Sequence, residues 1–168
     1  MTRLAVYPGS FDPIHNGHLD IVERCLPMFD ELVIAVLRNE EKRPLFSVEE
    51  RVETIRELLA GNGRVRVESF SGLLVDFVER VGAVAIVRGL RALSDFEYEF
   101  QMALMNRRLN ARIETVFMMP AESYSYVSSR LVKEVVQLGA RVTGLVPPVV
   151  ERRLRDKYGD PPERRKRR

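Results

Sequence analysis

Short apolar runs alternate with longer amphipathic segments along this chain of 168 residues. Five runs, each bounded by turn residues, predict β-strands at Leu4–Tyr7, Leu32–Leu37, Val65–Ser69, Val84–Val87 and Thr115–Met118. Strands that alternate with helices are typical of a parallel sheet covered by helices, and no internal repeat or linker divides the pattern. We therefore expect an α/β fold: a Rossmann-like, doubly wound, five-stranded parallel sheet with helices on both faces.

Apolar residues between these runs recur at helical spacing. The clearest helix is expected over 47–59, where a serine followed three residues later by Glu50 forms a capping box. The same spacing recurs with Glu97 at the start of a helix expected over 94–109. A third helix is expected over 128–138, beginning at either of two serines and stopped by a glycine.

Both histidines of the chain, His15 and His18, follow the first predicted strand and the turn Pro8-Gly9-Ser10. A strand that ends in such a turn and opens a helix offers free backbone N–H groups and a positive dipole end, which favour phosphate. Two imidazoles on that first turn share a face and point at the same ligand. Zinc is the alternative ligand, but a structural site needs four donors and no further Cys/His cluster exists, so we expect no metal site.

Cations and hydroxyls also follow the other predicted strands. Because the carboxyl ends of parallel strands meet at one edge, these groups should converge on an anionic ligand. Arg88 and Arg91 carry planar forks that suit phosphate oxygens, and Gly89 between them permits close backbone approach. Lys42 could simply be solvated, and Ser128 could simply cap a helix, although a cap also presents donors to phosphate.

Several segments together resemble the phosphopantetheine adenylyltransferase family of the nucleotidyltransferase superfamily. They are Tyr-Pro-Gly-Ser-Phe-Asp-Pro-Ile-His-Asn-Gly-His from Tyr7, Arg88-Gly89-Leu90-Arg91, Asp95-Phe96-Glu97-Tyr98-Glu99, Met105-Asn106-Arg107 and the segment from Ser128-Ser129 to Leu131-Val132-Lys133-Glu134-Val135. The resemblance extends to Tyr158 and implies transfer of an adenylyl group from ATP to 4′-phosphopantetheine. It also implies Mg²⁺ accompanying ATP, a homohexamer, and coenzyme A as feedback inhibitor.

The resemblance also implies roles for single residues. His18, Lys42 and Arg91 would be catalytic. ATP would be bound by Ser10, Phe11, His15, His18, Arg88, Gly89, Arg91, Glu99, Tyr124, Ser125, Tyr126, Val127, Ser128, Ser129 and Arg130. The acceptor would be bound by Ser10, Lys42, Leu74, Arg88, Asn106 and Glu134. This chain departs from the family at three of these positions: Ser10 replaces a frequent threonine, His15 replaces a threonine found in some members, and Arg130 replaces a serine or threonine.

The net charge of +3 comes from the C-terminus, where residues 164–168 carry five positive charges. We expect a nucleotidyltransferase domain over 1–158 and a basic, disordered tail over 159–168. Nucleic-acid binding would rest on that tail alone and is not expected. No apolar stretch reaches membrane-spanning length and no signal peptide begins the chain, so a cytoplasmic protein that binds no membrane is expected. Cys25 is expected to be a buried apolar group.

Two other functions stay open on the sequence. The first is a nucleotidyltransferase that uses nicotinate mononucleotide or glycerol phosphate as acceptor, against which the segment 95–99 and Asn106 argue. The second is a noncatalytic nucleotide-binding regulator, which the combination of His15, His18 and Lys42 disfavours.

Deleting residues 159–168 should leave turnover nearly unchanged, because no motif residue lies there and the tail cannot bury enough apolar surface to order itself. Steady-state rates of the full and truncated chains test this expectation. Loss of soluble expression or of activity on truncation would show that the tail packs or assembles.

Overall fold

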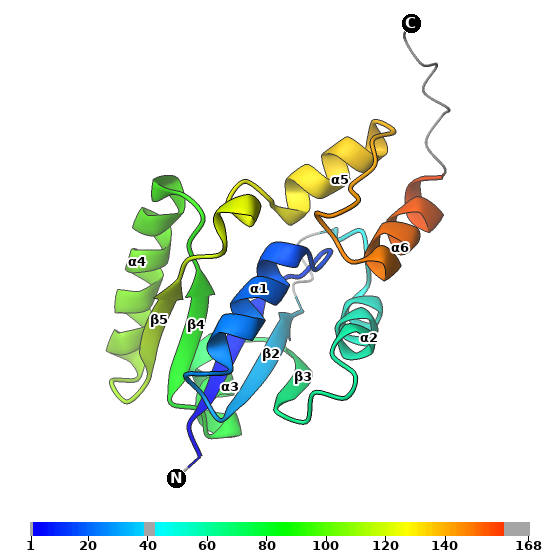
Figure 1. Ribbon diagram of the computed structural model, residues 1–168. Coiled ribbons are helices and arrows are strands. Elements are labelled where there is room, and N and C mark those ends of the chain that lie inside the picture. Colours follow the sequence, from blue (N-terminus) through cyan, green and yellow to red (C-terminus); the bar gives the residue numbers. More distant parts are fainter. Residues whose placement is uncertain (1, 39–42, 160–168) are drawn as a thin grey trace, which may run out of the picture.

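The computed structural model describes residues 2–38 and 43–159, so Lys42 and nearly all of the predicted tail lie outside the described residues. Within them, five parallel strands form one sheet in the order β3-β2-β1-β4-β5. The strands are β1 (Leu4–Gly9), β2 (Glu31–Leu37), β3 (Val65–Phe70), β4 (Ala85–Gly89) and β5 (Glu114–Met118). The predicted fold is confirmed, and the winding of the chain reverses between β1 and β4 (Figure 1).

Helices cover both faces of this sheet. They are α1 (Asn16–Cys25), α2 (Val48–Leu58), α3 (Leu74–Val81), α4 (Leu93–Leu109), α5 (Ser129–Gln137) and α6 (Pro148–Tyr158), with a 3₁₀ turn, η1 (Glu122–Tyr124). The helices α1 and α2 pack on one face and α3 on the other, while α5 lies beyond the carboxyl ends of the strands (Figure 1).

The central strands are buried on both faces, which explains their unbroken apolar runs. In β1, Ala5 and Tyr7 face the layer that contains α1 and α2, whereas Leu4 and Val6 face α3. All four side chains are buried. Because alternate residues of a strand point to opposite faces, this register leaves no polar position in the middle of β1.

Two strands run two residues further than the sequence predicted. In β4, Arg88 and Gly89 pair with Phe117 and Met118 of β5, so they belong to the sheet and not to a loop. The side chain of Arg88 therefore leaves from the hydrogen-bonded end of a strand. Such an end is stiffer than a loop, and it sets the direction of the guanidinium group.

The predicted caps hold for two helices and fail for one. The Ser47 hydroxyl accepts a bond from the Glu50 N–H at 3.1 Å, and the Ser128 hydroxyl caps α5. The helix α4 begins at Leu93 with Ala92 as its N-cap, so the capping box expected at Ser94 is wrong. Ser94 lies inside the first turn because the Asp95 N–H bonds to the Ala92 carbonyl at 3.1 Å, which starts the helix earlier.

Cys25 is buried, as predicted. Among the described helices, none combines the length and apolar character that crossing a membrane requires.

Replacing Ser47 with alanine should lower the free energy of unfolding by about 1 kcal/mol, because the first turn of α2 loses its cap. Denaturant unfolding of both chains measures this difference. The exposed Ser71 supplies a matched control, since Ser71→Ala should change stability by less than about 0.5 kcal/mol. Equal effects at both positions would contradict the capping role.

Candidate active site

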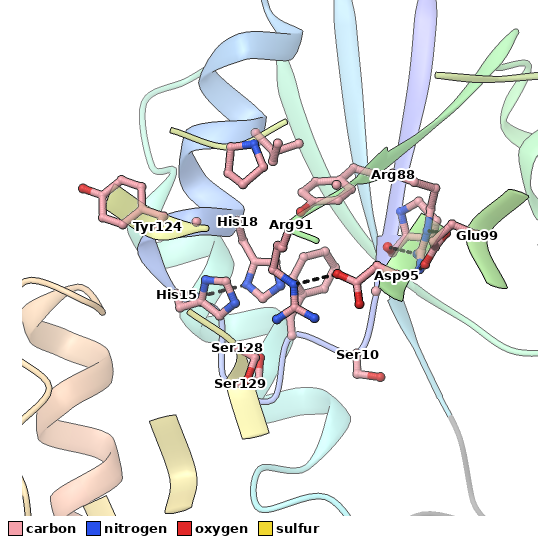
Figure 2. A pocket seen from close by; sticks show the side chains of 18 of the residues that line it. Ser10, His15, His18, Arg88, Arg91, Asp95, Glu99, Tyr124, Ser128 and Ser129 are labelled. Atoms are coloured by element: carbon pink, nitrogen blue, oxygen red, sulfur yellow. Dashed lines mark hydrogen bonds and ion pairs between the residues drawn. The ribbon is translucent and has the colours of Figure 1, made fainter. Parts of the chain in front are cut away.

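A polar cavity of about 490 Å³ opens at the carboxyl ends of β1 and β4, where the strand order reverses. This is the place where open α/β sheets bind ligands. Its lining comprises Tyr7, Pro8, Gly9, Ser10, Phe11, His15, Gly17, His18, Ile21, Arg88, Gly89, Arg91, Asp95, Glu99, Pro120, Tyr124, Ser128, Ser129 and Arg130. Figure 2 shows the two imidazoles at one side of the view and the Arg88–Glu99 pair at the other.

The two histidines stack at the start of α1. His15 is the N-cap residue, His18 is the third residue of the helix, and their ring centroids lie 3.6 Å apart. A side chain at Gly17 would crowd this stack, because a Cβ there would lie 3.0 Å from the His15 ring. The glycine between the histidines therefore lets the rings lie beside the helix N-terminus.

One hydrogen bond selects the tautomer of His18. The backbone N–H of His15 donates to Nδ1 of His18 at 3.1 Å, so Nδ1 carries a lone pair. A neutral ring then holds its proton on Nε2, which is the atom able to donate to a ligand.

Both imidazoles are uncharged near neutral pH. Burial, with a smaller contribution from the positive charge of Arg91, lowers the pKa of His15 to about 3. The pKa of His18 is also well below its ordinary value, chiefly through burial and then through His15, Arg91 and Arg88. Nδ1 of His15 is buried and has no hydrogen-bond partner in the described part of the chain. The pair thus acts as a set of neutral hydrogen-bonding groups at a helix N-terminus.

Arg88 is held by Glu99 at the other side of the cavity. Its Nε and Nη2 atoms donate to the Glu99 carboxylate at 2.8 and 2.6 Å, and Nη1 donates to the Pro8 carbonyl at 2.9 Å. Burial disfavours the charged guanidinium, but the bonds to Glu99 outweigh it and raise the pKa of Arg88 above its ordinary value. A guanidinium has five N–H groups, so Arg88 keeps donors for a ligand.

Arg91 links two loops at the rim. Its Nε donates to Asp95 at 3.3 Å and its Nη1 donates to the Val127 carbonyl at 3.0 Å. These contacts join the end of β4 to the segment that leads into α5. The cation therefore sits in the cavity wall beside both histidines, whose pKa values it lowers.

A second cavity of about 450 Å³ adjoins the first and is more apolar. Both cavities are lined by Pro8, Gly9, Ser10, Arg88 and Glu99. The second cavity extends between β2, β3 and α4 over Leu37, Phe70, Gly72, Leu73, Leu74, Tyr98, Met102, Ala103, Met105, Asn106, Leu109 and Thr115. Leu74 and Asn106, which the sequence placed at the acceptor, therefore lie together.

The segment 124–130 contributes unevenly to the first cavity. Tyr124, Ser128, Ser129 and Arg130 line it, and the Ser129 hydroxyl also donates to the Pro13 carbonyl at 2.8 Å.

The other three residues of the segment point elsewhere. The Ser125 hydroxyl bonds to the Glu122 carbonyl, Tyr126 is 61% exposed, and Val127 is packed in the core.

Glu134 lines neither cavity and pairs with Arg130 at 2.9 Å. Lys42 lies outside the residues that the structure describes. The ligand roles expected for all of these residues stay predictions.

Two buried charged residues that the sequence reasoning missed support the turn before α1. Asp12 accepts bonds from Leu45 N–H, Phe46 N–H and Lys133 Nζ at 3.0, 2.9 and 2.7 Å. Arg51 donates to the Ser10 carbonyl at 2.6 Å, and also to the carbonyls of residues 37, 46 and 47. Arg51 was detectable as a charged residue on the apolar face of the predicted helix.

In the described residues, no group of three or more His, Cys, Asp or Glu side chains is arranged to hold a metal ion. The two carboxylates that line the first cavity, Asp95 and Glu99, each pair with an arginine.

The chain is similar to a family of known enzymes over nearly its whole length. A family model described as cytidylyltransferase-like matches residues 6–135. The phosphopantetheine adenylyltransferase of Geobacter sulfurreducens is 54% identical over 160 residues, covering 95% of this chain and 98% of that protein. The enzymes of the same name from Syntrophus aciditrophicus and Heliobacterium modesticaldum are 56% and 58% identical, over 94% of this chain and 96% and 94% of theirs.

A solved structure from Vibrio parahaemolyticus, assigned as a nicotinate-nucleotide adenylyltransferase, superimposes with a TM-score of 0.67. It covers 92% of this chain and 99% of that one at 18% sequence identity, a likeness that concerns the fold.

The low pKa of His15 should make stability depend on pH. Between pH 6.5 and about 3 the unfolded chain binds a proton at His15 that the folded chain does not, so unfolding becomes easier as the pH falls. In His15→Gln the free energy of unfolding should depend less steeply on pH. The difference in slope should be at most that of one bound proton, about 1.4 kcal/mol per pH unit.

Denaturant unfolding of both chains at pH 7, 6 and 5 measures the two slopes. Groups common to both chains cancel in the difference, apart from His18, whose pKa His15 also lowers. Parallel slopes would mean that His15 binds its proton equally in the folded and the unfolded chain.

Proposed function

The chain belongs to the cytidylyltransferase-like family and, within it, to the phosphopantetheine adenylyltransferases, and we propose that it transfers the adenylyl group of ATP to 4′-phosphopantetheine. The products are dephospho-coenzyme A and pyrophosphate, and the reaction is reversible. The observation that carries the proposal is the stacked histidine pair at a helix N-terminus, in a polar cavity that adjoins an apolar one.

The two cavities suit the two substrates. The polar one, with the N-terminal ends of α1 and α5 and with Arg91, fits a triphosphate. The apolar one, lined by Leu74, Met102 and other large side chains, fits the uncharged pantetheine arm. The phosphate of the acceptor would then meet the α-phosphate of ATP near Ser10 and Arg88, which line both cavities.

We infer an in-line attack without a general base. The acceptor phosphate is already an anion at neutral pH, so it loses no proton when it attacks the α-phosphorus. The new P–O bond forms as the bond to pyrophosphate breaks. Catalysis then consists of positioning the two phosphates and stabilising charge on the transferred group.

His18 would supply the central part of that stabilisation. Its neutral ring donates from Nε2 to an oxygen of the α-phosphate, and its orientation is set by the bond from His15 N–H. Arg91 adds positive charge from the cavity wall. Lys42 is proposed to contact the phosphates as well, on the resemblance of the family motif.

A magnesium ion bound to ATP would neutralise part of the triphosphate charge. The donor set fits an ion carried by phosphate oxygens and water, because Glu99 is held in a bidentate pair with Arg88. Asp95 has the longer contact, 3.3 Å to Arg91, and is the carboxylate available to the water shell of the ion.

We propose that the chain assembles as a homohexamer. The support is a set of exposed large apolar side chains on α4, a concentration typical of an interface. They are Phe96, Phe100 and Leu104, together with Tyr98, Met102, Met105 and Leu109, which also line the apolar cavity. Inhibition by coenzyme A and a cytoplasmic location stay predictions.

The function is tested by incubating the purified protein with ATP, Mg²⁺ and 4′-phosphopantetheine. Formation of dephospho-coenzyme A and pyrophosphate is expected, and absence of both would overturn the proposal. Nicotinate mononucleotide and glycerol phosphate, tried in parallel, test the rival acceptors. Tight ATP binding without turnover on any acceptor would instead favour a noncatalytic regulator.

Replacing His18 with alanine should lower kcat by on the order of 10²–10³, while the dissociation constant of ATP changes much less. The lost bond strengthens mainly in the transition state, which is why kcat carries the loss. Single-turnover rates and nucleotide binding measure the two effects.

The variant His18→Gln is the matched control, since its amide retains an N–H donor near the position of Nε2 and should lose less activity. Near-wild-type turnover in His18→Ala would refute the assigned role. Losses confined to binding would make His18 a ground-state contact.

A further inference from the structure

An ion pair between a buried carboxylate and a half-buried ammonium joins two walls of the polar cavity. Asp12 belongs to the turn between β1 and α1, and Lys133 lies on α5, 121 residues along the chain. Lys133 Nζ donates to Asp12 Oδ2 at 2.7 Å, and the Asp12 side chain is 8% exposed. Neither residue lines a cavity, so the pair acts from behind the walls.

The ion pair holds the N-terminal end of α5 in position. Ser128 and Ser129, at the N-terminal end of α5, line the polar cavity, and Lys133 lies about one helical turn further along. The Ser129 hydroxyl donates to the Pro13 carbonyl, next to Asp12. Two contacts one turn apart therefore fix both the distance and the tilt of α5 against the turn.

The same ion pair also affects the binding of an anionic ligand through its charge. Without Lys133, Asp12 would keep two backbone donors and the nearby charge of Arg51, but it would lose its ion-pair partner and leave more negative charge behind a phosphate site. A carboxylate in that position repels phosphate, and burial weakens the screening by solvent. Lys133 reduces this repulsion as well as holding α5.

The two cavities should respond differently to loss of the pair. The polar cavity takes Ser128, Ser129 and Arg130 from the start of α5 and the segment before it, whereas the apolar cavity takes no residue from either. A shift of α5 therefore changes the lining of the polar cavity and leaves the lining of the apolar cavity in place.

We propose that Lys133 is a positioning residue for the nucleotide: through Asp12 it holds the N-terminus of α5 against the phosphate-binding turn and pairs with the carboxylate behind it. The inference rests on the proposed function in taking ATP as the ligand of the polar cavity. It assigns Lys133 no contact with substrate.

Lys133→Met removes the ammonium group and keeps most of the stem. We expect the dissociation constant and the KM for ATP to rise about tenfold, because a small misplacement of a binding wall has effects of this size. The KM for the pantetheine acceptor should stay within about twofold. Calorimetric titration with ATP, steady-state kinetics in both substrates and thermal unfolding supply these values.

Two further variants separate positioning from folding. Lys133→Arg retains a cation that reaches Asp12 and should restore the ATP constants. Arg3→Met removes an exposed cation that pairs with Asp30 far from the carboxyl ends of the strands, and should leave both KM values unchanged.

An unchanged ATP constant, or an equal rise in both KM values with a lower melting temperature, would overturn the proposal. If Lys133→Met fails to fold, Lys133→Gln undergoes the same measurements. Failure of the wild-type chain to form dephospho-coenzyme A would count against the proposed function alone, because ATP binding still decides this proposal.

Discussion

The geometry of the site depends on how the turn between β1 and α1 is held. The turn must present the N-terminal end of α1 and both imidazoles to one cavity. Its supports come from other elements: the Asp12 carboxylate binds N–H groups before α2 and an ammonium on α5, and Arg51 holds the Ser10 carbonyl. These contacts bring the first and last thirds of the chain to one point.

The electrostatics of the site balance attraction for phosphate against the stability of the empty protein. Arg88 and Arg91 are each paired with a carboxylate, which offsets their mutual repulsion. Arg51 is buried and donates to backbone carbonyls, so its charge adds to the positive potential around the turn. The histidines avoid the cost of further charge by remaining neutral. Neutral donors and paired cations together suit a ligand that brings several negative charges of its own.

Local patterns in the sequence were sufficient for most of the fold but not for the supports of the site. The strands were predictable because burial on both faces produces unbroken apolar runs, and α2 because Ser47 and Glu50 cap it. The spacing of Ser94 and Glu97 gave a wrong prediction, because the serine of a capping box must itself have non-helical backbone angles. In the structure Ala92 is the N-cap residue of α4, and Ser94 lies within the helix. The partners of Asp12 could not be inferred, because they lie 33 to 121 residues away and depend on the packing of α5.

The arrangement of basic atoms favours a nucleophile that needs no deprotonation. Nδ1 of His18 is occupied by the His15 N–H, so that ring can donate but cannot readily accept a proton at this atom. Asp95 and Glu99 are held by arginines, which leaves neither as an unengaged base. Nδ1 of His15 has no partner among the described residues, but it is buried, and the low pKa of His15 makes it a weak base. A hydroxyl acceptor would require such a base at the reacting atoms. A phosphate acceptor requires only donors and positive charge, which are the groups that the described residues of this cavity provide.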